Sequence, residues 1–160
     1  MLQKMARLLI ANYIEHTDVS IKIMVVLIGK DNTIQIKNDV LAEIFQEIKQ
    51  YNYETGGIIG INESGIISAF RFDETYSSNP FEYSPNVDFL NQVINEEWAN
   101  ENIEFIGFVH SHLNNSEISQ QDIKYARQIL ANNKCFDAIL LGIVDLSKKL
   151  NFISWYNIAN

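Results

Sequence analysis

The sequence predicts an α/β fold in which a mixed β-sheet is flanked by helices. Apolar runs typical of strands alternate with segments of helical periodicity, in the order β, β, α, β, β, α, β, α, β, β. The chain has 160 residues, of which 47% are hydrophobic and 20% are charged, as expected of one globular domain with a substantial core. Its two prolines leave little room for a disordered linker.

The first thirty residues are expected to form an extension packed on the core, and residues 31–160 to form the main domain. Apolar residues at helical spacing predict a helix over residues 2–13. Residues 21–28 and 33–37 read as paired strands, joined by a turn over residues 29–32. The apolar stretch at residues 8–11 is too short for the core of a secretory signal.

A helix capped by Asn38 or Asp39 follows and should pack on the sheet. Residues 57–61 and 66–72 have the composition of a β-hairpin, with a turn over residues 62–65. The aromatic segment 73–83 is expected to be a surface loop near the functional end of the sheet.

Ser84 and Pro85 resemble a cap followed by a proline in the first helical turn, which predicts a helix through Trp98. The apolar run 105–109 predicts the next strand, and Ser119 is a candidate N-cap for another helix. Two final strands are expected, one over residues 137–144 and covered on both faces, the other an outer strand over residues 148–156.

Two histidines and an aspartate form a candidate metal site. His110 and His112 are two residues apart at the end of a strand, so both imidazoles should point to the same face. Asp122 lies on the inward side of the following helix, where a carboxylate needs a partner. Two imidazoles and one carboxylate leave a fourth tetrahedral position open, as in catalytic zinc sites. Glu54, beside the Gly56-Gly57 pair, is the candidate proton carrier.

These residues resemble the signature of the JAMM (MPN+, JAB-type) zinc metallopeptidases: Glu54, the His110-Ser-His112 motif, Ser119, and Asp122 three positions later. The resemblance covers roughly residues 38–150. It departs from the family in two places: six residues instead of seven separate His112 from Ser119, and Leu113 stands where proline is common.

The resemblance implies an MPN/JAB-like (cytidine-deaminase-like) fold and one Zn²⁺ held by His110, His112 and Asp122. It further implies that Glu54 is the general acid/base and that Ser119 helps to stabilise the oxyanion. The expected activity is hydrolysis of an amide or isopeptide bond at the C-terminal tail of a ubiquitin-like or sulfur-carrier-like protein. The tail is expected to bind in an extended conformation beside a strand edge.

Several alternatives stay open. Ser119 and Asp122 could form only a helix-capping pair, and the chain could be a non-catalytic MPN-type scaffold that binds a partner protein, or a small-molecule amidohydrolase. A cupin is disfavoured, because a helix is predicted where that fold needs strands.

The net charge of −8 argues against nucleic-acid binding, which needs clustered Lys and Arg. No segment approaches the length of a membrane span. The single cysteine, Cys135, cannot form an internal disulfide and is expected to be structural, so the cytoplasm is the simplest compartment. A monomer and a homodimer are both compatible with the sequence.

Overall fold

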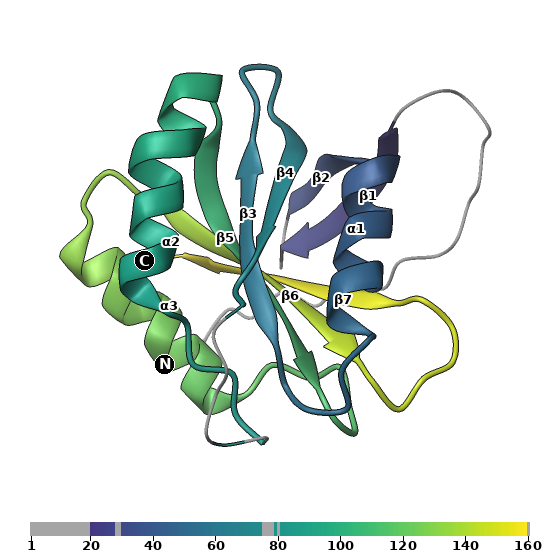
Figure 1. The fold of residues 1–160 in the computed structure, drawn as a ribbon. Coiled ribbons are helices and arrows are strands. Elements are labelled where there is room, and N and C mark those ends of the chain that lie inside the picture. Colours follow the sequence, from purple (N-terminus) through teal and green to yellow (C-terminus); the bar gives the residue numbers. More distant parts are fainter. Residues whose placement is uncertain (1–19, 28–29, 75–78, 80, 160) are drawn as a thin grey trace.

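A computed structural model describes residues 20–27, 30–74, 79 and 81–159, which form one seven-stranded mixed sheet with helices on both faces (Figure 1). The strand order is β1-β2-β4-β3-β5-β6-β7. In chain order the elements are β1 (Ser20–Leu27), β2 (Lys30–Lys37), α1 (Asn38–Ile48), β3 (Gly56–Ile61), β4 (Ile66–Phe72), α2 (Val87–Gln92), a π-helical turn (Val93–Glu97), a 3-10 turn (Trp98–Glu101), β5 (Glu104–His112), α3 (Gln120–Asn132), β6 (Ala138–Asp145) and β7 (Ile153–Ala159). The predicted mixed α/β architecture is confirmed.

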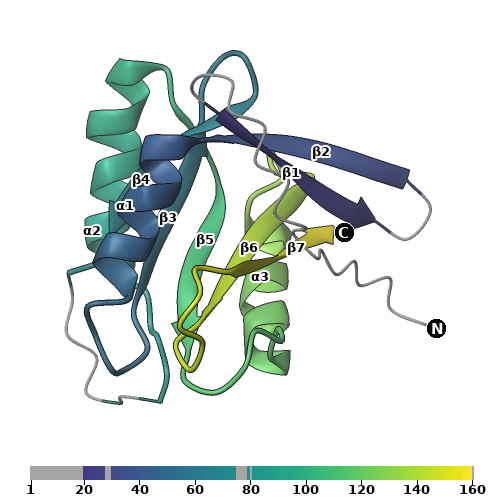
Figure 2. The ribbon, with the colours of Figure 1, turned by 90° about the vertical axis from the view of Figure 1, so that its right-hand side faces the viewer.

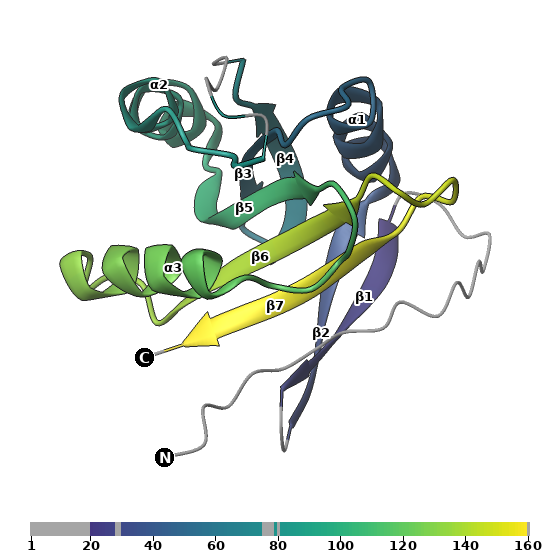
Figure 3. The ribbon, with the colours of Figure 1, turned by 90° about the horizontal axis from the view of Figure 1, so that it is seen from below.

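Strand β5 has a neighbouring strand on each side. Strand β5 lies between β3, with which it is antiparallel, and β6, with which it is parallel. The β1–β2 hairpin joins the sheet through a short parallel pairing of β2 with β4, and it extends beyond the other strands (Figures 2 and 3). The ends of β5 and β6 therefore lie in the middle of the sheet, supported on both sides.

The two faces of the sheet bury separate apolar clusters. Helix α1 covers one face, while α2 and α3 cover the other (Figure 3). Neighbouring residues of a strand contribute to opposite clusters, as Ile58 and Ile59 do on β3 and as Leu140 and Leu141 do on β6. This alternation is the period of two expected of a strand covered on both faces, so the prediction for residues 137–144 is confirmed.

Two predicted helix starts were wrong. Asn38 and Asp39 lie inside α1, whose N-cap position is Lys37, without a side-chain cap. Asn86 caps α2 by accepting a hydrogen bond from Phe89 N, so the helix begins two residues after the Ser84-Pro85 pair. Short polar residues recur near both starts, and the tertiary path of the chain decides which of them caps the helix.

Two strands also differ from the predicted bounds. Strand β2 begins at Lys30, so residues 30–32, predicted as a turn, are paired with β1. The outer strand β7 begins at Ile153 and not near Lys148, because Asp145 accepts hydrogen bonds from the backbone N and the Oγ of Ser147 and ends β6 in a turn.

The predicted helix over residues 2–13 lies outside the described residues. Among the helices that are described, none has the length and apolar content needed to cross a membrane.

Candidate metal centre

Strand β5 delivers His110 and His112 to one face of the sheet. Phe108, two residues before His110, belongs to the cluster under α2 and α3, while Val109 belongs to the cluster under α1. Both imidazoles therefore lie on the α3 side, as the two-residue period requires. Their side chains are only 7% and 12% exposed, respectively.

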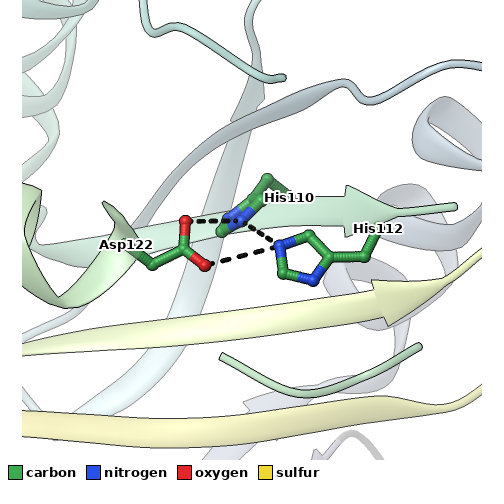
Figure 4. Close-up of side chains that lie close together, drawn as sticks. All are labelled: His110, His112 and Asp122. Atoms are coloured by element: carbon green, nitrogen blue, oxygen red, sulfur yellow. Dashed lines mark hydrogen bonds and ion pairs between the residues drawn. The ribbon is translucent and has the colours of Figure 1, made fainter. Parts of the chain in front are cut away.

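Helix α3 delivers the carboxylate through its first turn. Ser119 is the N-cap: its Oγ accepts a hydrogen bond from Asp122 N at 3.1 Å, and its own N–H donates to Asp122 Oδ2 at 2.8 Å. This reciprocal capping box holds the Asp122 side chain at the helix start. Ser119 and Asp122 therefore do form the helix-capping pair that was considered as an alternative. The same hydrogen bonds hold Asp122 so that its carboxylate faces the two histidines (Figure 4).

The three side chains meet at distances that suit zinc. His110 Nε2 lies 3.1 Å from His112 Nε2 and 3.1 Å from Asp122 Oδ1, and His112 Nε2 lies 3.4 Å from Asp122 Oδ2. Ligand atoms bonded to zinc at about 2.0–2.1 Å in a tetrahedron are about 3.3 Å apart. The donor set, two imidazoles and one carboxylate, is one that zinc accepts, and all three groups could hold one ion.

The loop after β5 orients His112. Its Nδ1 lies 3.4 Å from Asn115 Oδ1, which also accepts a hydrogen bond from Glu117 N. A carbonyl partner at Nδ1 favours the tautomer whose Nε2 lone pair is free for a metal. Sequence reasoning missed Asn115, because the segment between His112 and Ser119 has no regular pattern.

Tyr83 packs on the other histidine. Its ring lies 5.9 Å from the His110 ring between centroids, and its hydroxyl donates a hydrogen bond to Asp73 Oδ2 at 3.0 Å. Asp73 is buried, and its backbone N–H donates to Gly56 O. The described part of the predicted aromatic loop is thereby fixed beside the metal centre, although no pattern in the sequence singled out Tyr83.

Gly56 leaves the space that Tyr83 and His110 occupy. A Cβ at this position would lie 2.7 Å from each of His110 Cβ, Tyr83 Cε1 and Val109 O.

We expect Gly56→Ala to lower the free energy of unfolding by about 1–3 kcal/mol and to weaken zinc binding. Gly60→Ala is the matched control, because its Cβ would contact Ile103 and Trp98 at the far end of β3. Denaturant unfolding and zinc titration of both variants test this: equal loss of zinc affinity in the two variants would contradict it.

Hydrogen bonds between Thr55 and Ser111 hold the backbone next to Glu54 against the end of β5. Ser111, fully buried between the histidines, donates its N–H to Thr55 O at 2.8 Å and accepts from Thr55 N with its Oγ at 3.0 Å. These bonds fix the residue after Glu54 to the end of β5. The Glu54 side chain lines the same cleft of about 360 Å³ as His110, His112 and Asp122.

The ionisable groups in the cleft change one another's pKa values. Burial raises the pKa of Glu54, and the nearby histidines only partly oppose that rise. Burial alone would raise the pKa of Asp122, but hydrogen bonds from His110, His112 and Ser119 lower it below its ordinary value. Burial lowers the pKa of His112, yet its hydrogen bond and charge interaction with Asp122 raise it overall. Asp122 is therefore held as a carboxylate, the form a metal needs.

These shifts predict opposite pH dependences for stability and zinc binding. The folded pKa of His112 is raised above 6.5, so its contribution to stability is present below that pH and is lost as pH rises through the folded value. The folded pKa of Asp122 is lowered below 3.8, so its contribution is lost only as pH falls below that value. We expect unfolding of the metal-free protein in EDTA to become easier from pH 6 to pH 9, while zinc affinity increases as the imidazoles lose their protons. Stability that rises over this range would contradict the His112 assignment, and Asp122→Asn should flatten the slope.

Ser119 was expected to help stabilise an oxyanion, and its hydroxyl is hydrogen-bonded to Asp122. Its Oγ donates to Asp122 Oδ2 at 2.7 Å while accepting from Asp122 N. The hydroxyl is engaged in positioning the aspartate, and contact with an oxyanion would require it to turn away from Asp122. Oxyanion stabilisation by Ser119 stays a prediction.

No family model matches the sequence, and no curated protein matches it. Among solved structures, the chain is similar to the solution structure of protein DSY2949 from Desulfitobacterium hafniense, with a TM-score of 0.63 and 14% sequence identity. The match covers 78% of this chain and 84% of that one. This similarity concerns the fold alone.

Proposed function

We propose that the protein is a zinc-dependent peptidase that hydrolyses an amide or isopeptide bond. The observation that carries this proposal is the mutual spacing of 3.1–3.4 Å among ligand atoms of His110, His112 and Asp122, with Glu54 in the same cleft. A bound zinc ion would polarise the scissile carbonyl and make water nucleophilic at neutral pH. The ordered resemblance to the JAMM signature supports the same assignment.

The chain's own residues supply the remaining chemistry. Glu54 would accept a proton from the attacking water and pass it to the leaving amine, as a carboxylate with a raised pKa can do near neutral pH. Asp122 would stay ionised and hold the metal, because Ser119 and the histidines stabilise its charge. Two carboxylates in one cleft thus have environments suited to different roles.

A protein substrate suits the surroundings of the site. Phe81 is 72% exposed at the rim of the cleft, and the exposed Asn114 and Asn115 lie along it, so the cleft is open to solvent. An open cleft favours an extended tail over an enclosed small molecule. We propose the C-terminal tail of a ubiquitin-like or sulfur-carrier-like protein as the substrate class.

The competing proposal, a non-catalytic scaffold, predicts that no metal is needed. Zinc analysis of the purified wild-type protein tests the metal assignment, with one ion per chain expected. Incubation with ubiquitin-like and sulfur-carrier-like proteins fused through their C-terminal tails to a reporter tests the activity, with and without a chelator. A metal-free protein that binds such fusions without cleaving them would favour the scaffold.

A further inference from the structure

Asp73 is a buried carboxyl group that the proposed chemistry does not use. It follows β4 directly and is 2% exposed. Its Oδ2 accepts hydrogen bonds from the Tyr83 hydroxyl at 3.0 Å and from Asn86 N at 2.7 Å, and its own N–H donates to Gly56 O at 2.9 Å. Burial of a carboxyl group is costly unless its oxygens are hydrogen-bonded. These bonds therefore stabilise the segment from Tyr83 to Asn86 against β3 and β4.

Tyr83 connects this anchor to two parts of the candidate site. Its ring lies 5.9 Å from the His110 ring between centroids, at an interplanar angle of 27°. Its backbone N–H donates a hydrogen bond to the Glu54 carboxyl group and stabilises the charged form of that group. Burial and the neighbouring Asp73 raise the pKa of the Tyr83 hydroxyl, so this hydroxyl keeps its proton and stays a donor to Asp73.

The segment that contains Tyr83 is held from two sides. The Tyr83 ring packs directly against the backbone of β3, because a Cβ on Gly56 would lie 2.7 Å from Tyr83 Cε1. On the other side, Gln121 in the first turn of α3 donates a hydrogen bond to Glu82. Glu54 is thus hydrogen-bonded to a backbone group that is itself fixed by packing and by hydrogen bonds, as a precisely placed functional group requires.

The position of Glu54 matters because a proton carrier acts over a short distance. A general base must lie within about 2.6–3.2 Å, between heavy atoms, of the group whose proton it accepts. A misplacement of about 1 Å can lower the rate about 100-fold. A residue that restricts the Glu54 side chain can therefore affect the rate without any contact with the substrate.

We propose that Tyr83 is a positioning residue, which holds the Glu54 carboxyl group in place for proton transfer and is itself held by Asp73. The inference rests on the proposed peptidase function, since it concerns the residue that carries the proton there. Tyr83 acts through Glu54 and not through the metal. Its replacement should therefore lower kcat while KM and the zinc content stay unchanged.

Hydrolysis of the reporter fusion by the zinc-loaded protein tests this role. Tyr83→Phe removes the hydrogen bond to Asp73 and keeps the ring, and it should lower kcat about 10-fold, whereas Tyr83→Ala also removes the ring and should lower kcat about 100-fold. Tyr125→Phe is the matched control, because it removes the hydroxyl of a tyrosine that packs on Phe108 and does not line the cleft. It should leave kcat unchanged. Zinc content and KM are measured for each variant.

A double-mutant cycle tests whether Tyr83 acts through Asp73. Asp73→Ala removes the acceptor, so Tyr83→Phe should cause no further loss of kcat in that background. Asp73→Asn is the conservative variant, and it also serves if Asp73→Ala does not fold. Its amide oxygen can accept both hydrogen bonds, so it should keep most of the wild-type kcat, and Tyr83→Phe should lower kcat in its presence as in the wild type.

Amide hydrogen exchange tests the contact with Glu54 in the absence of substrate. Exchange of the backbone amide of Tyr83 should be about 10-fold faster in Glu54→Ala, which lacks the acceptor, than in the wild type or in Glu54→Gln, whose side-chain oxygen can still accept. Glu63→Ala, at an exposed position beyond the other end of β3, should leave this exchange rate unchanged.

The outcomes separate this inference from the proposed function. Unchanged kcat in both Tyr83 variants of a zinc protein that cleaves the fusion would overturn the positioning role and leave the peptidase in place. A loss of zinc that accounts for the fall in kcat would also overturn it, since Tyr83 would then act on His110. Exchange at Tyr83 that Glu54→Ala does not alter would remove the contact on which the inference stands. A wild-type protein that binds no zinc and cleaves no fusion would overturn the peptidase proposal and this inference together.

Discussion

Replacing Glu54 with glutamine is expected to lower the rate of hydrolysis by about 10²- to 10⁴-fold while the zinc content stays at one ion per chain. Glutamine has nearly the same shape but cannot accept a proton from water or return one to the leaving amine. Burial raises the pKa of Glu54, which brings this carboxyl closer to the pH at which it can both accept and donate. The measurement is cleavage of the reporter fusion under single-turnover conditions, together with metal analysis.

Glu63→Gln is the matched control. Glu63 is exposed in the turn that follows β3, at the opposite end of this strand from Glu54. The same change in charge there should leave both the rate and the zinc content unaltered. A Glu54→Gln protein as active as the wild type would remove Glu54 from the proposed chemistry without affecting the metal assignment.

Removing one metal ligand is expected to have the other large effect. His110→Ala should weaken zinc binding by at least about 100-fold, since changes to residues that only support ligands already cost 10- to 100-fold. Hydrolysis should then fall to the level of the chelated wild type. His110 is buried, and its Nε2 lies 3.1 Å from both His112 Nε2 and Asp122 Oδ1, so its removal takes away one of the three ligand atoms that meet there. Competition with a colorimetric zinc chelator measures the affinity.

Asp122→Asn extends the test to the carboxylate and has its own control. The amide is a poorer zinc ligand than a carboxylate, so zinc affinity should again fall strongly. Asp88→Asn makes the same substitution at an exposed position in the first turn of α2 and should retain zinc. Full zinc occupancy in both Asp122→Asn and His110→Ala would show that the ion binds elsewhere.

Most of the architecture was predictable because it depends on short-range periodicity. Hairpin composition placed residues 66–72 in a strand with the bounds that β4 has, and the capping residue Ser119 marked the start of α3 correctly. The same reasoning failed at α2, where Ser84 and Pro85 offered a plausible start but Asn86 caps the helix. Local propensities there are nearly equal, so packing of the segment on the sheet decides the boundary.

The candidate site was predictable to a similar degree. His110, His112 and Asp122 lie together as expected, and Glu54 lines their cleft. Asn115, Tyr83 and Asp73 escaped notice because they lie in irregular segments and act through contacts that no regular spacing in the sequence marks. A single polar or aromatic residue in such a segment carries no periodic signal.

By itself, the sequence determined the types of chemical group available and the faces on which they lie. The two-residue period of β5 places both imidazoles on one side, and the helix start at Ser119 turns Asp122 inward, since both effects depend only on backbone geometry. Only the tertiary structure decided that these groups approach within 3.4 Å, that Gly56 leaves room for Tyr83 against His110, and that a buried carboxyl group holds this tyrosine there. Those features depend on how β3, β5 and α3 pack against one another, and such packing follows from the whole core and not from any single segment.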